Sequence, residues 1–175
     1  MEPPQHPAQQ PGKSIGRGMM IAGWLIVLAL LTWVFGNWEE SRYNPNQNVA
    51  TTSSGGQVEV SLQRNRWGHY VANGTINGKT VTYLLDTGAT DVSIPGHLEK
   101  KLGLSRGRSF NASTANGIIQ VYGTTLDTFT LGGIEMRNVR ASINPHMKAN
   151  EILLGMSVLQ HLELVQKGDS LTIRQ

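Results

Sequence analysis

Asp86, Thr87 and Gly88 form a tripeptide with a candidate catalytic carboxylate, and they directly follow an apolar run of strand-like composition, Val81–Leu85. A strand behind the aspartate would hold its carboxylate in place, and the small threonine hydroxyl can bond to backbone. The glycine lets a neighbouring backbone segment or a substrate approach closely. Such a loop suits the activation of water by a carboxylate. Because a tripeptide is a weak signal alone, its surroundings decide what it means.

The residues around this tripeptide resemble those of the aspartic proteases. Leu84–Ala89 is similar to the hydrophobic-hydrophobic-Asp-Thr-Gly-Ala/Ser motif shared by pepsins and retroviral proteases, and Ile94-Pro95 matches the apolar-Pro pair that often follows it. The segment Ile152–Gly155 resembles the apolar-apolar-Gly element that passes behind the catalytic loop in this family. In that element Leu154 and Gly155 would give structural support to the site.

This resemblance implies a fold and an activity. The fold is all-β, a retropepsin-like closed or partly open β-barrel with one or two short helices, and the activity is that of an aspartic endopeptidase acting on polypeptide substrates. Asp86 would be catalytic, with Thr87, Gly88 and Ala89 supporting the catalytic loop. The group that the chain resembles is the bacterial single-pass, retropepsin-like proteases.

The chain carries one Asp-Thr-Gly loop, whereas a pepsin-like chain carries two. Asp127-Thr128-Phe129 lacks the glycine and cannot replace the second loop. The resemblance therefore implies a homodimer in which each subunit gives one Asp86 across a two-fold axis. Two carboxyl groups in such close contact share a single proton. The ionised group takes a proton from water, while the protonated group polarises the scissile carbonyl.

Asn116-Gly117 lies between the two matching elements and resembles the tip of the flap that covers the substrate in this family. The alternative is an ordinary hairpin turn. The chain departs from pepsins in having no tyrosine at this tip, since Tyr122 lies further along. Asp91 is a second candidate for substrate binding. It could contact substrate backbone, pair with an arginine near the cleft, or bond to its own loop.

Composition excludes several other functions. The 175 residues include no cysteine, so disulfides, thiolate metal sites and a cysteine nucleophile are excluded. The five histidines lack metal-ligand spacing, and we expect no metal and no cofactor. The net charge is +3, and a basic cluster lies within 100–108. No aromatic residues are interleaved in that cluster for base stacking, so we expect no nucleic-acid partner.

The N-terminal part differs in composition from the rest. Residues 1–17 are rich in Pro and Gln and are expected to be disordered. Residues 18–38 carry no charge, and the apolar run within them is about 27 Å long as a helix, close to the roughly 30 Å of a hydrocarbon core. We expect a transmembrane helix over 18–38. A cleaved signal peptide is the alternative, but the run is long and Val34–Trp38 is a poor cleavage site.

Basic residues near the ends of this helix predict its orientation. Lys13 and Arg17 precede it and Arg42 alone follows closely, which predicts a cytoplasmic N-terminus. The expected location is a bacterial inner membrane, with the protease domain in the periplasm. Residues 39–56 read as a flexible linker, and the protease domain is expected over 57–175.

From residue 57 onward the sequence predicts strands, beginning with a segment in which Val58, Val60 and Leu62 alternate with polar residues. Tyr70–Ile76 and Lys79–Leu85 flank Asn77-Gly78, which favours a hairpin. Further hairpins are expected at Asn116-Gly117, Gly132-Gly133 and Gly168-Asp169. Short helices are expected over His97–Leu102 and Ser157–Leu162.

Two other classes of function remain open at this stage. The chain could be a non-catalytic module that binds extended peptides by strand addition. It could also be a structural membrane protein that shares the fold and leaves the cleft unused. The intact Asp-Thr-Gly sequence favours the enzyme.

Overall fold

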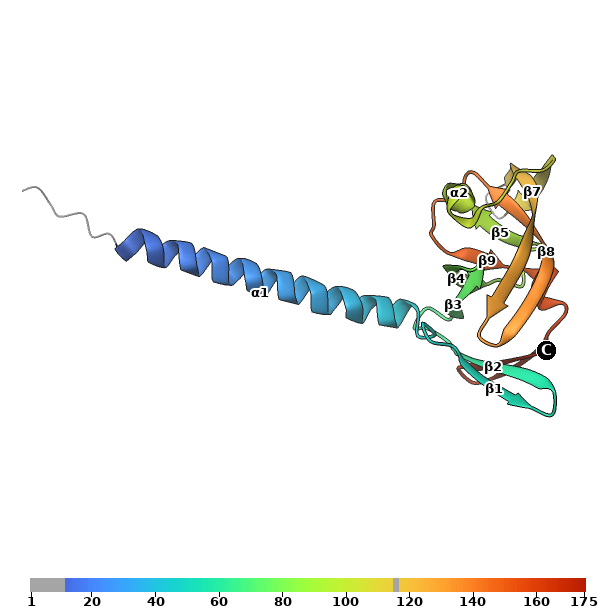
Figure 1. Cartoon of the computed structure of the whole chain (residues 1–175), viewed down its shortest axis with the longest axis horizontal. Helices are drawn as coiled ribbons and strands as arrows, with labels where there is room; N and C mark the ends of the chain where they lie inside the picture. Colours follow the sequence, from blue (N-terminus) through green and yellow to red (C-terminus); the bar gives the residue numbers. More distant parts are fainter. Residues whose placement is uncertain (1–11, 115–116) are drawn as a thin grey trace, which may run out of the picture. The chain divides into compact units, whose positions relative to one another are not determined.

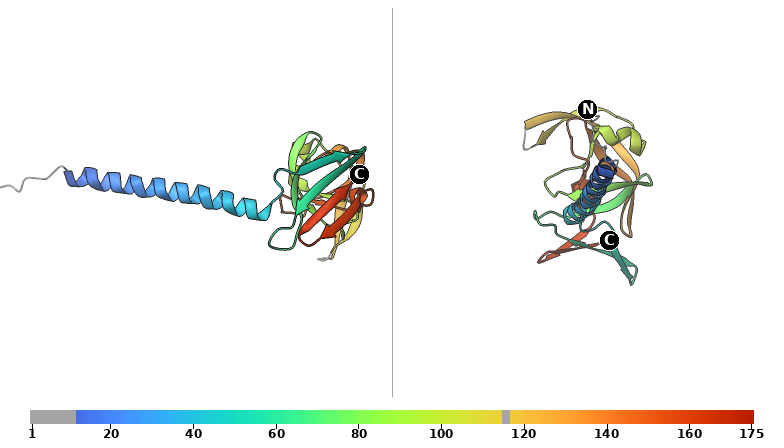
Figure 2. Two further views of the ribbon diagram at one scale, coloured as in Figure 1. Left: turned by 90° about the horizontal axis from the view of Figure 1, so that it is seen from below. Right: turned by 90° about the vertical axis from the view of Figure 1, so that its left-hand side faces the viewer.

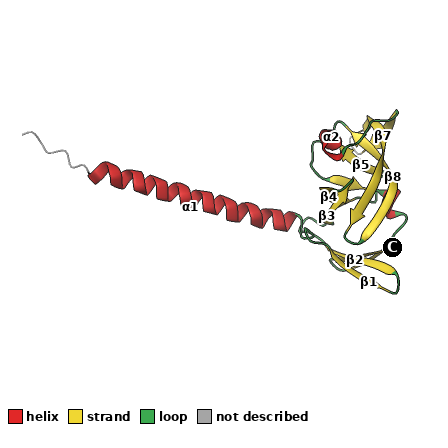
Figure 3. Cartoon of the chain, viewed as in Figure 1, coloured by secondary structure: helices red, strands yellow, loops and turns green. Residues whose placement is uncertain are grey.

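The computed structural model describes residues 12–114 and 117–175. The chain divides into two compact units, Met1–Glu40 and Ser41–Gln175, which are considered separately. Figure 1 shows the long helix and the β domain, and Figure 3 shows that strands make up most of that domain. As expected, the domain is mostly β with few short helices, and a long apolar helix lies near the N-terminus.

Helix α1 spans Gly12–Tyr43 and is longer than the expected 18–38 at both ends. Its large apolar side chains are exposed, Trp24 and Trp33 by 68% and 66%. Within the described residues it is the one helix long and apolar enough to cross a membrane, over Gly16–Tyr43. Both a membrane anchor and an N-terminal signal sequence have these properties. Residues 1–11 of the expected disordered tail lie outside the described part, while 12–17 are helical.

The β domain holds two sheets, and Figure 2 shows them from two further sides. The four-stranded sheet has the order β1-β2-β11-β10. The seven-stranded sheet has the order β3-β4-β9-β5-β8-β7-β6, and a β3–β7 pairing almost closes it into a ring. Strand β6 extends from β7 beyond this ring. The strands are β1 (Ala50–Ser54), β2 (Gln57–Gln63), β3 (Val71–Ile76), β4 (Lys79–Leu85), β5 (Val92–Pro95), β6 (Ser109–Thr114), β7 (Gly117–Leu131), β8 (Ile134–Asn144), β9 (Ile152–Leu154), β10 (Glu163–Lys167) and β11 (Ser170–Arg174).

Turn residues set the register of the hairpins. Asn77 and Gly78 both have positive φ, 50° and 72°, as a two-residue turn of type I′ requires. This turn aligns β3 with β4 so that Ala72 faces Tyr83. The expected hairpins at Gly132-Gly133 and Gly168-Asp169 are confirmed by the β7–β8 and β10–β11 pairs.

Three short helical segments complete the domain. The 3-10 turn η1 (Gly96–Leu98) and helix α2 (Glu99–Leu102) confirm the helix expected there, which ends at Gly103 with a positive φ of 69°. Helix α3 (Met156–Leu159) is shorter than the expected Ser157–Leu162 and begins one residue earlier.

One hydrophobic core joins the two sheets. Val60 and Ile173 come from the four-stranded sheet and pack in the same cluster as Leu126 and Phe129 of β7. Tyr83 is fully buried in this cluster, and its hydroxyl donates to the Thr75 carbonyl over 2.7 Å. Burial raises the pKa of Tyr83, so the phenol stays a hydrogen-bond donor.

The segment 39–56 differs from the expected flexible linker. It contains the end of α1 and strand β1, which pairs with β2 along its whole length. Asn46 is buried: its Nδ2 donates to the carbonyls of Gln63 and Val71 over 2.9 and 2.7 Å, and its Oδ1 accepts from the Gln63 amide over 2.7 Å. A polar side chain thus takes the place of strand hydrogen bonds and ties this segment into the domain. The domain boundary at 57 remains a prediction.

Candidate active site

Asp86 follows immediately after β4, whose neighbour is the parallel strand β9. Leu84 pairs with Leu153 and Leu85 pairs with Leu154. The register continues past the strand end, because the Asp86 amide donates to the Leu154 carbonyl over 3.1 Å. Apolar residues on both strands therefore fix the backbone on which the aspartate stands.

The Asp86 carboxylate is held by its own loop. The Gly88 amide donates to Asp86 Oδ1 over 2.9 Å, and the Ala89 amide donates to the Asp86 carbonyl over 3.2 Å. Asp86 is half-buried, while Thr87 and Gly88 are exposed. The carboxylate thus has a fixed position and an open side, as a group that meets a water molecule or a substrate needs.

Segment β9–α3 supports the loop from behind. A Cβ at Gly155 would lie 2.3 Å from the Asp91 carbonyl oxygen and 2.6 Å from that of Ala89, so only glycine fits. The Met156 amide donates to the Ala89 carbonyl over 2.8 Å. The Ser157 hydroxyl accepts from the Val92 amide over 3.0 Å. Sequence reasoning missed the contribution of Ser157, which carries no local signal besides its place after the apolar-Gly segment.

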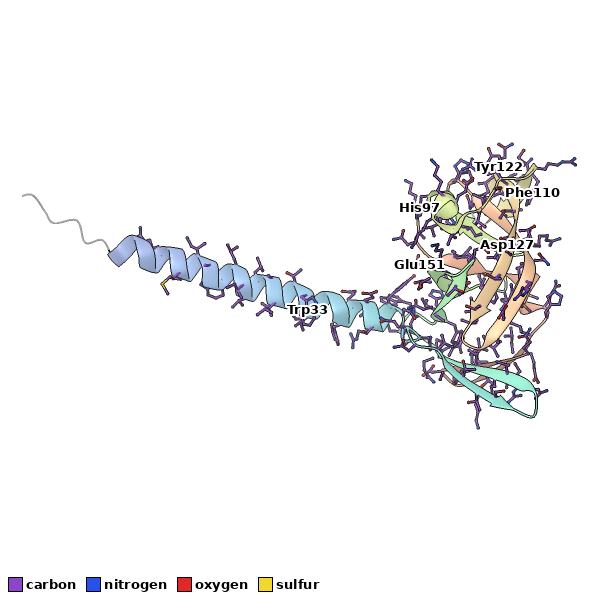
Figure 4. All side chains as sticks on the ribbon, in the orientation of Figure 1. Trp33, His97, Phe110, Tyr122, Asp127 and Glu151 are labelled. Carbon is purple, nitrogen blue, oxygen red and sulfur yellow. The ribbon has the colours of Figure 1, made fainter. Side chains whose placement is uncertain are left out.

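A groove of about 710 Å³ lies over the loop. Its lining includes Asp86 and Ala89 of the loop, residues of β6, Leu153 of β9 and Ser142 of β8. Figure 4 shows Phe110 and Tyr122 on the neighbouring strands β6 and β7. The full lining is Asp86, Gly88, Ala89, Thr90, Asp91, Ser93, Phe110, Asn111, Ala112, Ser113, Thr114, Val121, Ser142 and Leu153.

Asp91 lies in this lining and is paired with Arg140 of β8. Arg140 Nε and Nη2 lie 2.8 and 2.7 Å from Asp91 Oδ1. The Asp91 side chain is 14% exposed and that of Arg140 is 69% exposed. Pairing with an arginine is one of the alternatives expected for Asp91. Nothing in the sequence identified Arg140 as the partner, since Asp91 directly precedes β5 while Arg140 lies in β8.

The β6–β7 hairpin lies beside the groove, at the place where the family resemblance leads us to expect a flap. Gly117 begins β7 with a φ of 110° and pairs with Thr114. Asn116 lies outside the described residues. Asp127 is exposed on β7 and does not line the groove, in agreement with its exclusion as a second catalytic residue (Figure 4). Among the described residues no group of three or more metal-ligating side chains comes together.

The comparisons with known proteins agree with this geometry. The family model described as "gag-polyprotein putative aspartyl protease" matches residues 72–161, which include β4, the Asp86 loop, the β6–β7 hairpin and β9. The chain belongs to this family.

Three proteins illustrate the relationship. An uncharacterized Sinorhizobium protein is 34% identical over 91% of this chain and 74% of its own length. An uncharacterized Rickettsia prowazekii protein is 26% identical over 60% of this chain and 46% of its own length. The crystal structure of a retropepsin-like aspartic protease from Rickettsia conorii superposes with a TM-score of 0.56 and 24% identity, covering 73% of this chain and 94% of that one. This last similarity shows that the two share the fold.

Proposed function

We propose that this protein is an aspartic endopeptidase in which Asp86 activates water, that it is active as a homodimer, and that α1 anchors it in a membrane. The observation that carries the proposal is the placement of the Asp86 carboxylate, which is fixed by the Gly88 amide and opens into a groove of about 710 Å³. Membership of a family of aspartyl proteases supports the same reaction.

The proposed reaction needs two carboxyl groups. Since the chain has one Asp-Thr-Gly sequence, the second carboxyl group comes from Asp86 of another copy. The ionised carboxylate takes a proton from water as the water oxygen bonds to the scissile carbonyl carbon. The protonated carboxyl polarises the carbonyl oxygen, and the C–N bond then breaks as the leaving nitrogen is protonated.

The groove suits an extended polypeptide. In the described part of the chain β6 pairs with β7 alone, so it forms an edge of the sheet, and its residues line the groove. An extended peptide can pair with such an edge. Both arginine contacts of Asp91 fall on Oδ1, which leaves Oδ2 to accept from a substrate amide. We propose that Asp91 and the Gly117 end of the flap orient the substrate, and that Asn116 belongs to the flap tip.

The location is part of the proposal. The exposed apolar surface of α1 suits the hydrocarbon core of a bilayer, and its length is about 48 Å at 1.5 Å per residue. With Lys13 and Arg17 before the apolar run and Arg42 after it, the N-terminus is cytoplasmic and the β domain lies on the far side of the membrane. A bacterial single-pass protein of the inner membrane fits this arrangement.

Digestion of an unfolded protein and of a mixed peptide library by the full chain in nanodiscs tests the activity. Wild type cleaves, and Asp86→Asn loses about 10²–10⁴-fold because the near-isosteric amide cannot act as a general base. Asp127→Asn is the matched control, since Asp127 is exposed on β7 outside the groove. Peptide binding without cleavage by wild type would instead identify a binding module.

A further inference from the structure

The loop Arg64–His69, here called the Trp67 loop, displays an aromatic side chain beside the end of α1. Trp67 is 45% exposed. Its ring centroid lies 5.8 Å from that of Tyr43, in an edge-on arrangement, and the Arg66 guanidinium carbon lies 4.1 Å from the Trp67 centroid. The Trp67 ring is thus partly exposed to solvent and lies next to the cationic guanidinium of Arg66.

The fold holds this loop in place through a buried asparagine. Asn65 Oδ1 accepts from the amides of Trp67 and His69, each over 3.0 Å. Asn65 Nδ2 donates to the Tyr43 carbonyl over 3.0 Å. The Gly68 amide donates to the Asn65 carbonyl over 3.0 Å. Because these hydrogen bonds fix the backbone of the loop, the fold itself holds the Trp67 side chain at the surface.

Tyr43 is also the last residue of the helix that can cross a membrane. It follows Trp38, the end of the uncharged stretch, by five residues of helix, or about 7.5 Å of rise. The headgroup region on each side of a bilayer is about 5–7 Å thick. Tyr43 therefore lies near the outer edge of this region, and a ring in contact with Tyr43 can reach it; tryptophan is enriched there.

We propose that the Trp67 loop is a membrane-contact element, with the Trp67 ring in the phospholipid headgroup layer and Arg66 bonded to lipid phosphate. The inference rests on the membrane anchoring proposed above. Arginine suits phosphate because its guanidinium offers several donors in one plane. Arg64, at the start of the same loop, is paired with Asp169, so the contact requires phosphate and not a net anionic membrane.

Single-tryptophan forms of the full chain test this contact by fluorescence quenching. The chain has four tryptophans, and replacing three by phenylalanine leaves either Trp67 or Trp33 as the reporter. The proteins are reconstituted in phosphatidylcholine vesicles that carry bromine near the headgroup or deep in the acyl chains. A third form, with Phe110→Trp as its one tryptophan, reports on the groove wall.

The expected pattern is specific. Trp33 is quenched most by deep bromines, Trp67 is quenched more by shallow than by deep bromines, and the form with Phe110→Trp is unaffected. Arg66→Gln lowers the shallow quenching of Trp67. Unquenched Trp67 beside quenched Trp33 would overturn the inference and leave the anchor intact. Equal quenching of Trp67 and of the groove-wall reporter would also overturn it, because the contact would not belong to the loop. Unquenched Trp33 would refute the anchor and the inference with it.

Discussion

Replacement of Gly155 by alanine tests whether the β9–α3 segment positions the proposed catalytic loop. The added Cβ would lie 2.3 Å from the Asp91 carbonyl oxygen and 2.6 Å from that of Ala89, and both atoms are backbone. Ordinary contact at such a place begins near 3.4 Å, so the loop must retreat by about 1 Å. None of the nearest contacts is a flexible side chain that could move aside in place of the backbone.

The expected cost has two parts. Overpacking of this kind costs about 1–3 kcal/mol, or roughly 4–12 °C in Tm for a domain of this size. A misplacement of about 1 Å at a catalytic group lowers kcat/KM by about 10²-fold. The activity loss should exceed the loss of folded protein, since the loop that moves is the one that carries Asp86.

The assay compares Gly155→Ala with Gly123→Ala in the full chain. A Cβ at Gly123 would have its nearest contacts at 3.6 and 3.8 Å, which is ordinary packing. Thermal unfolding followed by intrinsic fluorescence gives Tm, and peptide hydrolysis well below Tm gives kcat/KM. Wild-type stability and activity in Gly155→Ala would refute the role assigned to this segment. Equal losses in both variants would show a general sensitivity of the fold to added methyl groups.

Three further predictions concern the segment before β2, the groove and the orientation. Asn46→Ala leaves the buried Val71 carbonyl and the part-buried backbone groups of Gln63 without this partner and should cost about 2–4 kcal/mol of the free energy of unfolding. Asn48→Ala, at an exposed position, should change the free energy of unfolding by less than about 0.5 kcal/mol. Equal effects in denaturant titrations would contradict the structural role of this segment. Arg140→Met should raise KM for peptides by up to about five-fold with little change in the free energy of unfolding, because the ion pair of this exposed arginine with Asp91 contributes at most about 1 kcal/mol. An unchanged KM would remove Asp91 from substrate binding. A protease added to spheroplasts should digest the β domain, and its protection would reverse the proposed orientation.

Sequence patterns predicted the parts of the fold that depend on local chemistry. Asn77-Gly78 predicted the β3–β4 hairpin because both positions need a positive φ. Alternation in Gln57–Gln63 predicted β2, in which Val60 and Leu62 are buried. The Asp86 loop and its apolar-Gly support were predicted from a family resemblance, and the structure brings the two together.

The remaining parts depend on long-range contacts that composition does not reveal. Strand β1, Ala50–Ser54, is polar and lies at a sheet edge, so it has no apolar alternation to detect. Asn46 reads as a linker residue, yet it is buried because its amide replaces backbone hydrogen bonds of two strands. The sequence did not reveal the partner of Asp91 either, since Arg140 lies 49 residues further along the chain.

The measurement that tests the central claim most directly is activity against composition in mixtures of wild type and Asp86→Asn. The two proteins are mixed in detergent so that subunits exchange, and are then reconstituted at constant total protein. If each active site takes one Asp86 from each of two chains, activity falls as the square of the wild-type fraction, and an equal mixture retains about a quarter of the wild-type rate. Activity proportional to the wild-type fraction, with about half retained in the equal mixture, would show that one Asp86 suffices and would contradict the shared dyad.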